Sequence, residues 1–101
     1  MTYRIVITPF AQADFLNVIY WYNQKRDSLG YEFIAEADRL MNLLSRNPFI
    51  FRIRKKQLRL ALLKRFPFTI VYEIEKQNVI IFSVIHQHSH PKKVFRKPAK
   101  K

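Results

Sequence analysis

The chain has 101 residues, of which 49% are hydrophobic and 15% aromatic, enough for one domain with one hydrophobic core and too few for two. It contains no cysteine, which excludes disulfides and thiolate metal sites and fits a reducing cytoplasm. No apolar run approaches the ~20 residues of a membrane span, and the N-terminus lacks the apolar core of a signal peptide, so a cytoplasmic protein without membrane contact is expected.

Positive charge is concentrated in the second half of the chain. Residues 1–45 carry four Lys/Arg and five Asp/Glu, whereas residues 46–101 carry fifteen and two, so the net charge of +12 divides into −1 and +13. A field of one sign favours a polyanionic partner, either a nucleic acid or an acidic protein segment. The alternative interpretation is that the cations only keep an aromatic-rich domain soluble.

The first half predicts a strand followed by two helices. Residues 3–7 alternate and are β-branched, which indicates a strand. Thr8 and Pro9 then suit the N-cap and first position of a helix that ends at residues 25–27. Its apolar stripe consists of Ala11, Phe15, Val18, Ile19 and Tyr22, with Tyr20 and Trp21 beside it.

A second helix is expected over about residues 31–46, and it ends at Asn47-Pro48 because a residue before proline leaves the helical region. Gly30, the only glycine, falls in the connection, where we expect a free backbone to be useful. The inner face of this helix is Phe33, Ala37, Leu40, Met41 and Leu44. The aromatic residues of this helical hairpin are interpreted as core rather than as a base-stacking platform.

The remainder predicts a three-stranded antiparallel meander over residues 58–65, 68–74 and 79–85. The last strand is apolar on both faces and should be central, whereas Glu73 and Glu75 should face solvent. Residues 49–57 fit either a short edge strand or an extended loop. The fold class is therefore α+β, a two-layer sandwich of order β-α-α-β-β-β with a helical hairpin packed on an antiparallel sheet. We expect one domain over residues 1–101, with a loosely ordered basic tail from about residue 96.

The order and spacing of these elements resemble the RelE/ParE superfamily of bacterial type II toxin–antitoxin toxins, the plasmid stabilisation proteins. The resemblance is most specific at Phe66-Pro67-Phe68-Thr69-Ile70-Val71-Tyr72-Glu73-Ile74, the apolar strand ending at His86, and His90-Pro91-Lys92-Lys93. It implies a growth-inhibiting toxin that a cognate antitoxin neutralises. It also implies one of two mechanisms: RelE-like toxins cut mRNA in the ribosomal A site, and ParE-like toxins poison DNA gyrase without cleaving nucleic acid.

The resemblance to RelE itself is incomplete at the catalytic positions. Two positions that are basic in RelE are Leu60 and Leu62 here, Lys64 keeps its cation, and Gln87 and Phe95 stand near the RelE arginine and tyrosine. Other ribonuclease toxins of the superfamily use a histidine near the end of the last strand. His86 is therefore a candidate acid/base for metal-independent cleavage, with Lys64, Arg65 and Arg59 as phosphate-binding cations. Alternatively, His86 only packs at the strand end, or the protein is an inactive relic.

A second group of cations is a candidate surface for nucleic acid or a protein partner: Arg52, Arg54, Lys55, Lys56, His90, Lys92 and Lys93. His86, His88 and His90 alternate and would share one strand face, but at about 6.5 Å apart they need not share an ion. We therefore predict no metal and no cofactor.

Overall fold

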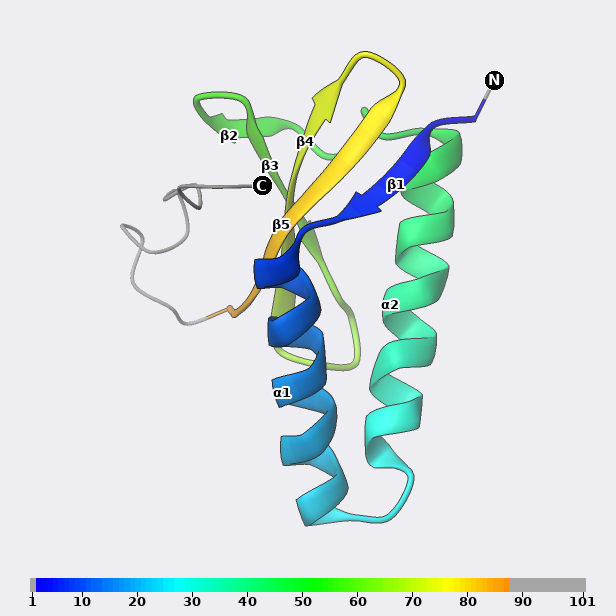
Figure 1. Cartoon of the computed structure of the whole chain (residues 1–101), viewed down its shortest axis with the longest axis vertical. Coiled ribbons are helices and arrows are strands. Elements are labelled where there is room, and N and C mark those ends of the chain that lie inside the picture. Colours follow the sequence, from blue (N-terminus) through cyan, green and yellow to red (C-terminus); the bar gives the residue numbers. More distant parts are fainter. Residues whose placement is uncertain (1, 88–101) are drawn as a thin grey trace.

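The computed structural model describes residues 2–87 as two helices packed on one face of a five-stranded sheet (Figure 1). The elements are β1 (Arg4–Ile7), α1 (Pro9–Lys25), α2 (Leu29–Arg46), β2 (Ile53–Lys55), β3 (Leu58–Leu62), β4 (Phe68–Glu75) and β5 (Asn78–His86). This is the predicted two-layer α+β architecture. The segment left open between a loop and an edge strand contains the short edge strand β2.

The sheet has the order β1-β5-β4-β3-β2 and is mixed. The predicted meander is confirmed, because β3, β4 and β5 are antiparallel neighbours. The expectation of a wholly antiparallel sheet is wrong at one edge, where β1 runs parallel to β5 with Val6 opposite Ile80. The long connection that such a parallel pair requires runs through the helical hairpin and then through β2, β3 and β4. The pairing of β1 with β5 also places β5 between β1 and β4, which explains why β5 is apolar on both faces.

Thr8 begins α1 as predicted and also attaches the helix to the sheet. Its hydroxyl oxygen accepts a hydrogen bond from the Ala11 N–H at 3.2 Å, which caps the helix, and lies 2.9 Å from the Ile81 carbonyl oxygen to which it donates. One turn further on, the Asp14 carboxylate accepts a hydrogen bond from the Val84 N–H at 2.9 Å. The first two turns of α1 are thereby fixed against β5.

Gly30 lies inside α2, and its role differs from the prediction. The residue with a left-handed backbone is Ser28, at φ 68, immediately before the helix begins at Leu29. A Cβ atom at Gly30 would lie 2.7 Å from the Ile19 carbonyl oxygen and 2.8 Å from Asn23 Oδ1. The Gly30 N–H donates to that same Asn23 oxygen at 2.8 Å. Glycine is therefore required for the close approach of the two helices, not for a turn conformation.

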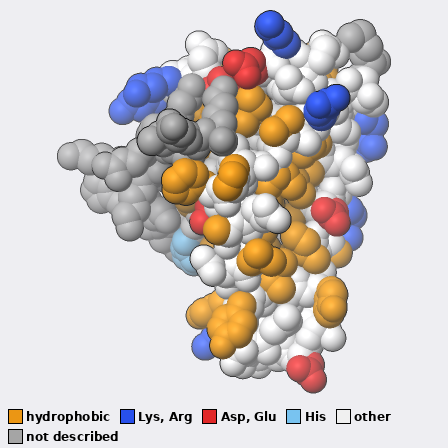
Figure 2. Space-filling model, viewed as in Figure 1, with side chains coloured by type: hydrophobic (Ala, Val, Ile, Leu, Met, Phe, Trp, Pro, Cys, Tyr) orange, Lys and Arg blue, Asp and Glu red, His pale blue; other side chains and the backbone are white. Residues whose placement is uncertain are grey.

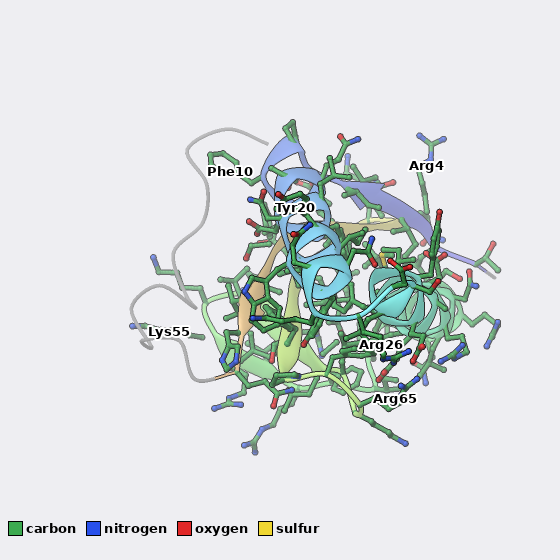
Figure 3. All side chains as sticks on the ribbon, turned by 90° about the horizontal axis from the view of Figure 1, so that it is seen from below. Arg4, Phe10, Tyr20, Arg26, Lys55 and Arg65 are labelled. Carbon is green, nitrogen blue, oxygen red and sulfur yellow. The ribbon has the colours of Figure 1, made fainter. Side chains whose placement is uncertain are left out.

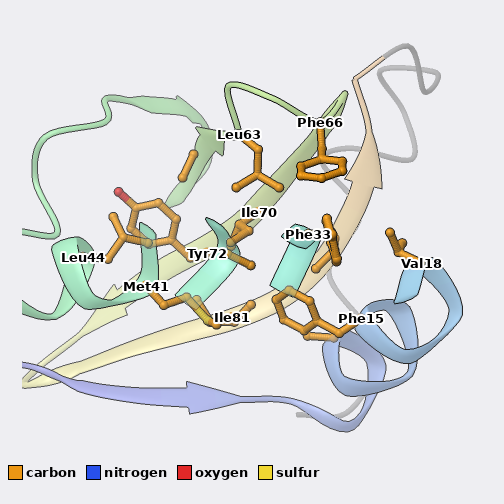
Figure 4. Close-up of a cluster of buried hydrophobic side chains, with 14 of the residues drawn as sticks. Phe15, Val18, Phe33, Met41, Leu44, Leu63, Phe66, Ile70, Tyr72 and Ile81 are labelled. Atoms are coloured by element: carbon orange, nitrogen blue, oxygen red, sulfur yellow. The ribbon is translucent and has the colours of Figure 1, made fainter. Parts of the chain in front are cut away.

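The core between helices and sheet combines aliphatic side chains with a group of aromatic rings (Figure 4). Phe33 is fully buried, and its ring lies 5.6 Å from Phe66 and 5.9 Å from Tyr22, centroid to centroid. The predicted inner faces are confirmed, with Ile19 and Leu40 only partly buried at their margins. Tyr20 and Trp21 do not join the core, since 69% and 52% of their surfaces are exposed.

The other face of the sheet, which neither helix covers, carries a second apolar cluster. Its buried members are Leu58, Val71, Ile80 and Phe82, with Leu60 and Ile85 partly buried beside them. Glu73 lies on this face and is only 8% exposed, so the prediction that it faces solvent is wrong, whereas Glu75 is exposed as expected. Along β4, the side chains on the face that bears the helices are therefore apolar, and most of those on the other face are also buried.

Neither helix of the described part of the chain is long and apolar enough to cross a membrane.

Candidate functional site

His86 lies at the edge of the sheet where β3 and β5 end and β4 begins. It is the last residue of β5, pairs with Phe68 at the start of β4, and its ring packs edge-on against Phe68 with centroids 5.3 Å apart. The next residue fixes this corner, because the Gln87 N–H donates to the Pro67 carbonyl at 2.8 Å and its side-chain amide donates to the Leu63 and Phe68 carbonyls. Paired residues share a sheet face, so His86 lies on the face that bears the helices, and its side chain is exposed.

Lys64 and Arg65 lie in the neighbouring β3–β4 loop, and α2 holds this loop in place. The Glu36 carboxylate accepts hydrogen bonds from the Lys64 N–H at 2.6 Å and from the Arg65 N–H at 3.3 Å. The Arg65 guanidinium donates to Glu32 at 2.8 Å, and Glu32 also pairs with Arg26 at 3.1 Å. The hydrogen bond from Arg65, and then that from Arg26, hold the pKa of the Glu32 carboxyl below its usual value. Arg26 and Arg65 accordingly lie on the same side of the molecule (Figure 3).

Arg59 lies towards the opposite end of the sheet. It pairs with Tyr72, four residues along β4 from the partner of His86, which corresponds to ~13 Å of strand. Its guanidinium donates to the Phe51 carbonyl at 2.6 Å and lies over the Phe49 ring, 5.3 Å from the centroid. The structure thus brings His86 and the Lys64–Arg65 loop to one end of the sheet and places Arg59 elsewhere.

Tyr72 stabilises the surroundings of Arg59. Its buried hydroxyl donates to the Pro48 carbonyl at 2.7 Å, linking β4 to the segment that follows α2. Burial raises the pKa of Tyr72 to about 12, although the nearby Arg59 charge acts in the opposite direction. This corner is therefore a packed structural site in which the arginine is already hydrogen-bonded.

The basic segment before β3 forms an exposed hairpin. Arg52, Arg54, Lys55 and Lys56 are all exposed, and Lys56 turns the chain with φ 55. Lys55 lies on the opposite side of the molecule from Arg65 (Figure 3). His90, Lys92 and Lys93, the other predicted binding residues, fall outside residues 2–87, as does His88. Within that range no three His, Asp or Glu residues are grouped to hold a metal ion.

Beside His86 lies an aromatic pocket that the sequence did not predict. This pocket, which we call the α1–β5 pocket, has a volume of about 320 Å³ and is lined by Asn17, Val18, Trp21, Tyr22, Pro67, Phe68 and His86. Two i, i+4 pairs on α1 form one side, Asn17 with Trp21 and Val18 with Tyr22. That spacing is visible in the sequence. The opposite wall exists only because the start of β4 and the end of β5 lie next to α1.

The fold is shared with chains from two toxin–antitoxin systems. A chain described as "Chromosomal ParDE TA system from P. aeruginosa" superposes with a TM-score of 0.74 and 16% identity, covering 84% of this chain and 96% of that one. A chain from the toxin–antitoxin complex RelBE2 of Mycobacterium tuberculosis gives a TM-score of 0.62 and 19% identity, covering 85% and 99%. At these identities the two likenesses show a shared fold.

The family itself is shown by the sequence. Residues 5–91 match the model of the ParE toxin of type II toxin–antitoxin systems, parDE, and the chain belongs to this family. No significant match is found among curated protein sequences. The resemblance identified from the residues around Tyr72 and His86 is thus confirmed at the level of the family.

Proposed function

We propose that this toxin inhibits growth by binding its target, DNA gyrase, rather than by cutting RNA. The observation that carries the proposal is the dispersal of the nuclease candidates: Arg59 donates to the Phe51 carbonyl at one end of the sheet, and His86 lies at the other. Arg65 is engaged by Glu32. Metal-free cleavage instead requires an acid/base and several free cations around one phosphate.

The position of Leu60 adds to this argument. Leu60 stands where RelE has a basic residue, and here it packs against the apolar cluster on the sheet face that neither helix covers. A leucine at this position provides no charge for a phosphate backbone. The same face therefore supports a binding toxin better than a nuclease.

We further propose that a cognate antitoxin with an acidic segment holds the toxin inactive in the cytoplasm. The two similar structures come from a ParDE system and a RelBE2 complex, which supports such a partner. The exposed cations of Arg52, Arg54, Lys55 and Lys56 have the charge that an acidic segment would complement. Gyrase, with its bound DNA, would meet the same positive field.

Ribosome-dependent mRNA cleavage is the second candidate, and one observation favours it. His86 is exposed, and Lys64 lies in the adjacent loop with its backbone fixed by Glu36. An imidazole at this position would take the 2′-OH proton, and a lysine would hold the phosphate. Arg59 lies at the other end of the sheet and Arg65 is paired with Glu32, so we place this function second.

Primer extension on mRNA from an in vitro translation reaction separates the two. The proposal predicts uncut mRNA with purified wild-type toxin and, independently, inhibition of gyrase supercoiling. Discrete cuts that disappear in His86→Ala would instead establish a ribosome-linked nuclease. If a folded protein neither cuts mRNA nor inhibits supercoiling, it is an inactive relic.

Charge reversal tests the basic hairpin. Arg54→Glu/Lys55→Glu/Lys56→Glu should weaken antitoxin and gyrase binding by at least tenfold at low salt, because opposite charges attract most when screening is small. The matched control Arg4→Glu/Arg39→Glu/Lys76→Glu changes the net charge equally at other exposed positions and should have a clearly smaller effect. Equal effects of the two triple variants would mean that only net charge matters.

A further inference from the structure

Trp21 forms an exposed wall of the α1–β5 pocket. It meets Tyr22 edge-on with centroids 5.1 Å apart, and half of its surface is open to solvent. Phe68, Pro67 and Tyr22 complete the apolar lining, while Asn17 and His86 supply the polar groups. Hydrophobic side chains are exposed over α1 on the same flank as the histidine (Figure 2).

The charge around this pocket is positive. The Lys25 ammonium lies 4.7 Å from the centroid of the Trp21 ring, so a cation is held against the pocket wall. No Asp or Glu lines the pocket. The described carboxylate closest in sequence, Asp14, is turned to the Val84 N–H.

We propose that the α1–β5 pocket binds an unpaired nucleobase of single-stranded nucleic acid. Aromatic side chains on which a base stacks, next to cations that meet the backbone, are the recurring elements of single-strand binding. The Asn17 amide has both a donor and an acceptor with which to meet a base edge. The volume of about 320 Å³ falls within the range of ligand sites, ~300–1,000 Å³.

A nucleobase fits this pocket better than an apolar side chain of a protein partner. An apolar anchor would leave the Asn17 amide without a hydrogen-bonding group opposite it, at a cost in free energy. A base offers two apolar faces and a polar edge, and the phosphate that it carries would meet Lys25, which lies beside Trp21. This site is separate from the basic hairpin and does not depend on the proposed gyrase target.

Trp21 is the only tryptophan of the chain, so its fluorescence reports directly on this pocket. Titration with a 12-nucleotide single-stranded RNA of mixed sequence should quench the emission saturably. A duplex of the same sequence keeps its bases stacked and should leave the emission nearly unchanged, even where it binds the basic surface. Equal quenching by strand and duplex would overturn the proposal.

Variants test the same claim by anisotropy of a fluorescein-labelled strand. Trp21→Ala should weaken binding about tenfold or more, in line with the loss of a base–aromatic stack of ~1–3 kcal/mol. Asn17→Ala should weaken it less and change the preference among poly(A), poly(U) and poly(C) strands. The control Tyr31→Ala removes a more exposed aromatic side chain, 73% exposed on α2, and should bind like wild type. Equal affinities of Trp21→Ala and Tyr31→Ala, or no binding of the strand at low salt, would refute the site.

Discussion

Gly30→Ala tests whether close helix packing, rather than helix propensity, decides stability at this position. Alanine is the better helix former by about 1 kcal/mol, so propensity alone predicts stabilisation. The structure predicts the opposite sign, because the new Cβ would lie 2.7 Å from the backbone oxygen of Ile19. That oxygen belongs to α1 and can retreat only if the helices separate.

The expected magnitude follows from three contributions. Overpacking of a tight contact costs about 1–3 kcal/mol, and loss of the hydrogen bond from the Gly30 N–H to Asn23 costs about 1 kcal/mol. Subtracting the propensity gain leaves a decrease of about 2 kcal/mol in the free energy of unfolding, or roughly 10 °C in melting temperature for a domain of this size.

Urea unfolding followed by far-UV circular dichroism measures this change. Asn23→Ala removes only the hydrogen bond and should lose about 1 kcal/mol. Ala35→Gly, at an exposed position of α2, calibrates propensity in the same helix and should also lose about 1 kcal/mol. If Gly30→Ala raises the urea midpoint, the packing argument is wrong.

Two further predictions concern buried polar groups. Tyr72→Phe should lower the free energy of unfolding by about 1–2 kcal/mol, because the Pro48 carbonyl loses its donor, whereas Tyr31→Phe at the surface should change it little; equal effects in urea unfolding would contradict this. Burial raises the pKa of the Asp14 carboxyl above its usual 3.8, outweighing the hydrogen bond from Val84. Its contribution to stability is therefore fully present below pH 3.8 and is lost as the pH rises through the higher folded-state pKa. The unfolding free energy of wild type relative to Asp14→Asn should fall over that interval, and a difference that is constant or rises with pH would refute the assignment.

Local patterns predicted most of the fold. The 3.6-residue period placed both inner helix faces, Thr8-Pro9 and Asn47-Pro48 marked helix ends, and alternation placed the meander. The parallel pairing of β1 with β5 could not be predicted in this way, because it joins residues more than seventy positions apart, such as Val6 and Ile80. The interior position of β5, with a neighbouring strand on each side, was nonetheless implied by its apolar character on both faces.

The site was less predictable because its geometry depends on tertiary partners. The sequence shows Arg59 and Arg65 as equivalent cations, but Phe51 and Glu32 hold their guanidinium groups in different places. Similarly, Trp21 looked like an extension of the apolar stripe on α1. Its exposure depends on where the end of β5 meets the helix.

Binding of gyrase is the proposed mode of action of this ParE-family toxin. Gyrase supercoiling of relaxed plasmid with increasing purified toxin tests it, with toxin preincubated with its antitoxin as the control. We expect a loss of supercoiling that saturates with toxin concentration, is relieved by the antitoxin, and persists in His86→Ala. Undiminished supercoiling by folded wild-type toxin, together with mRNA cuts that require His86, would contradict it.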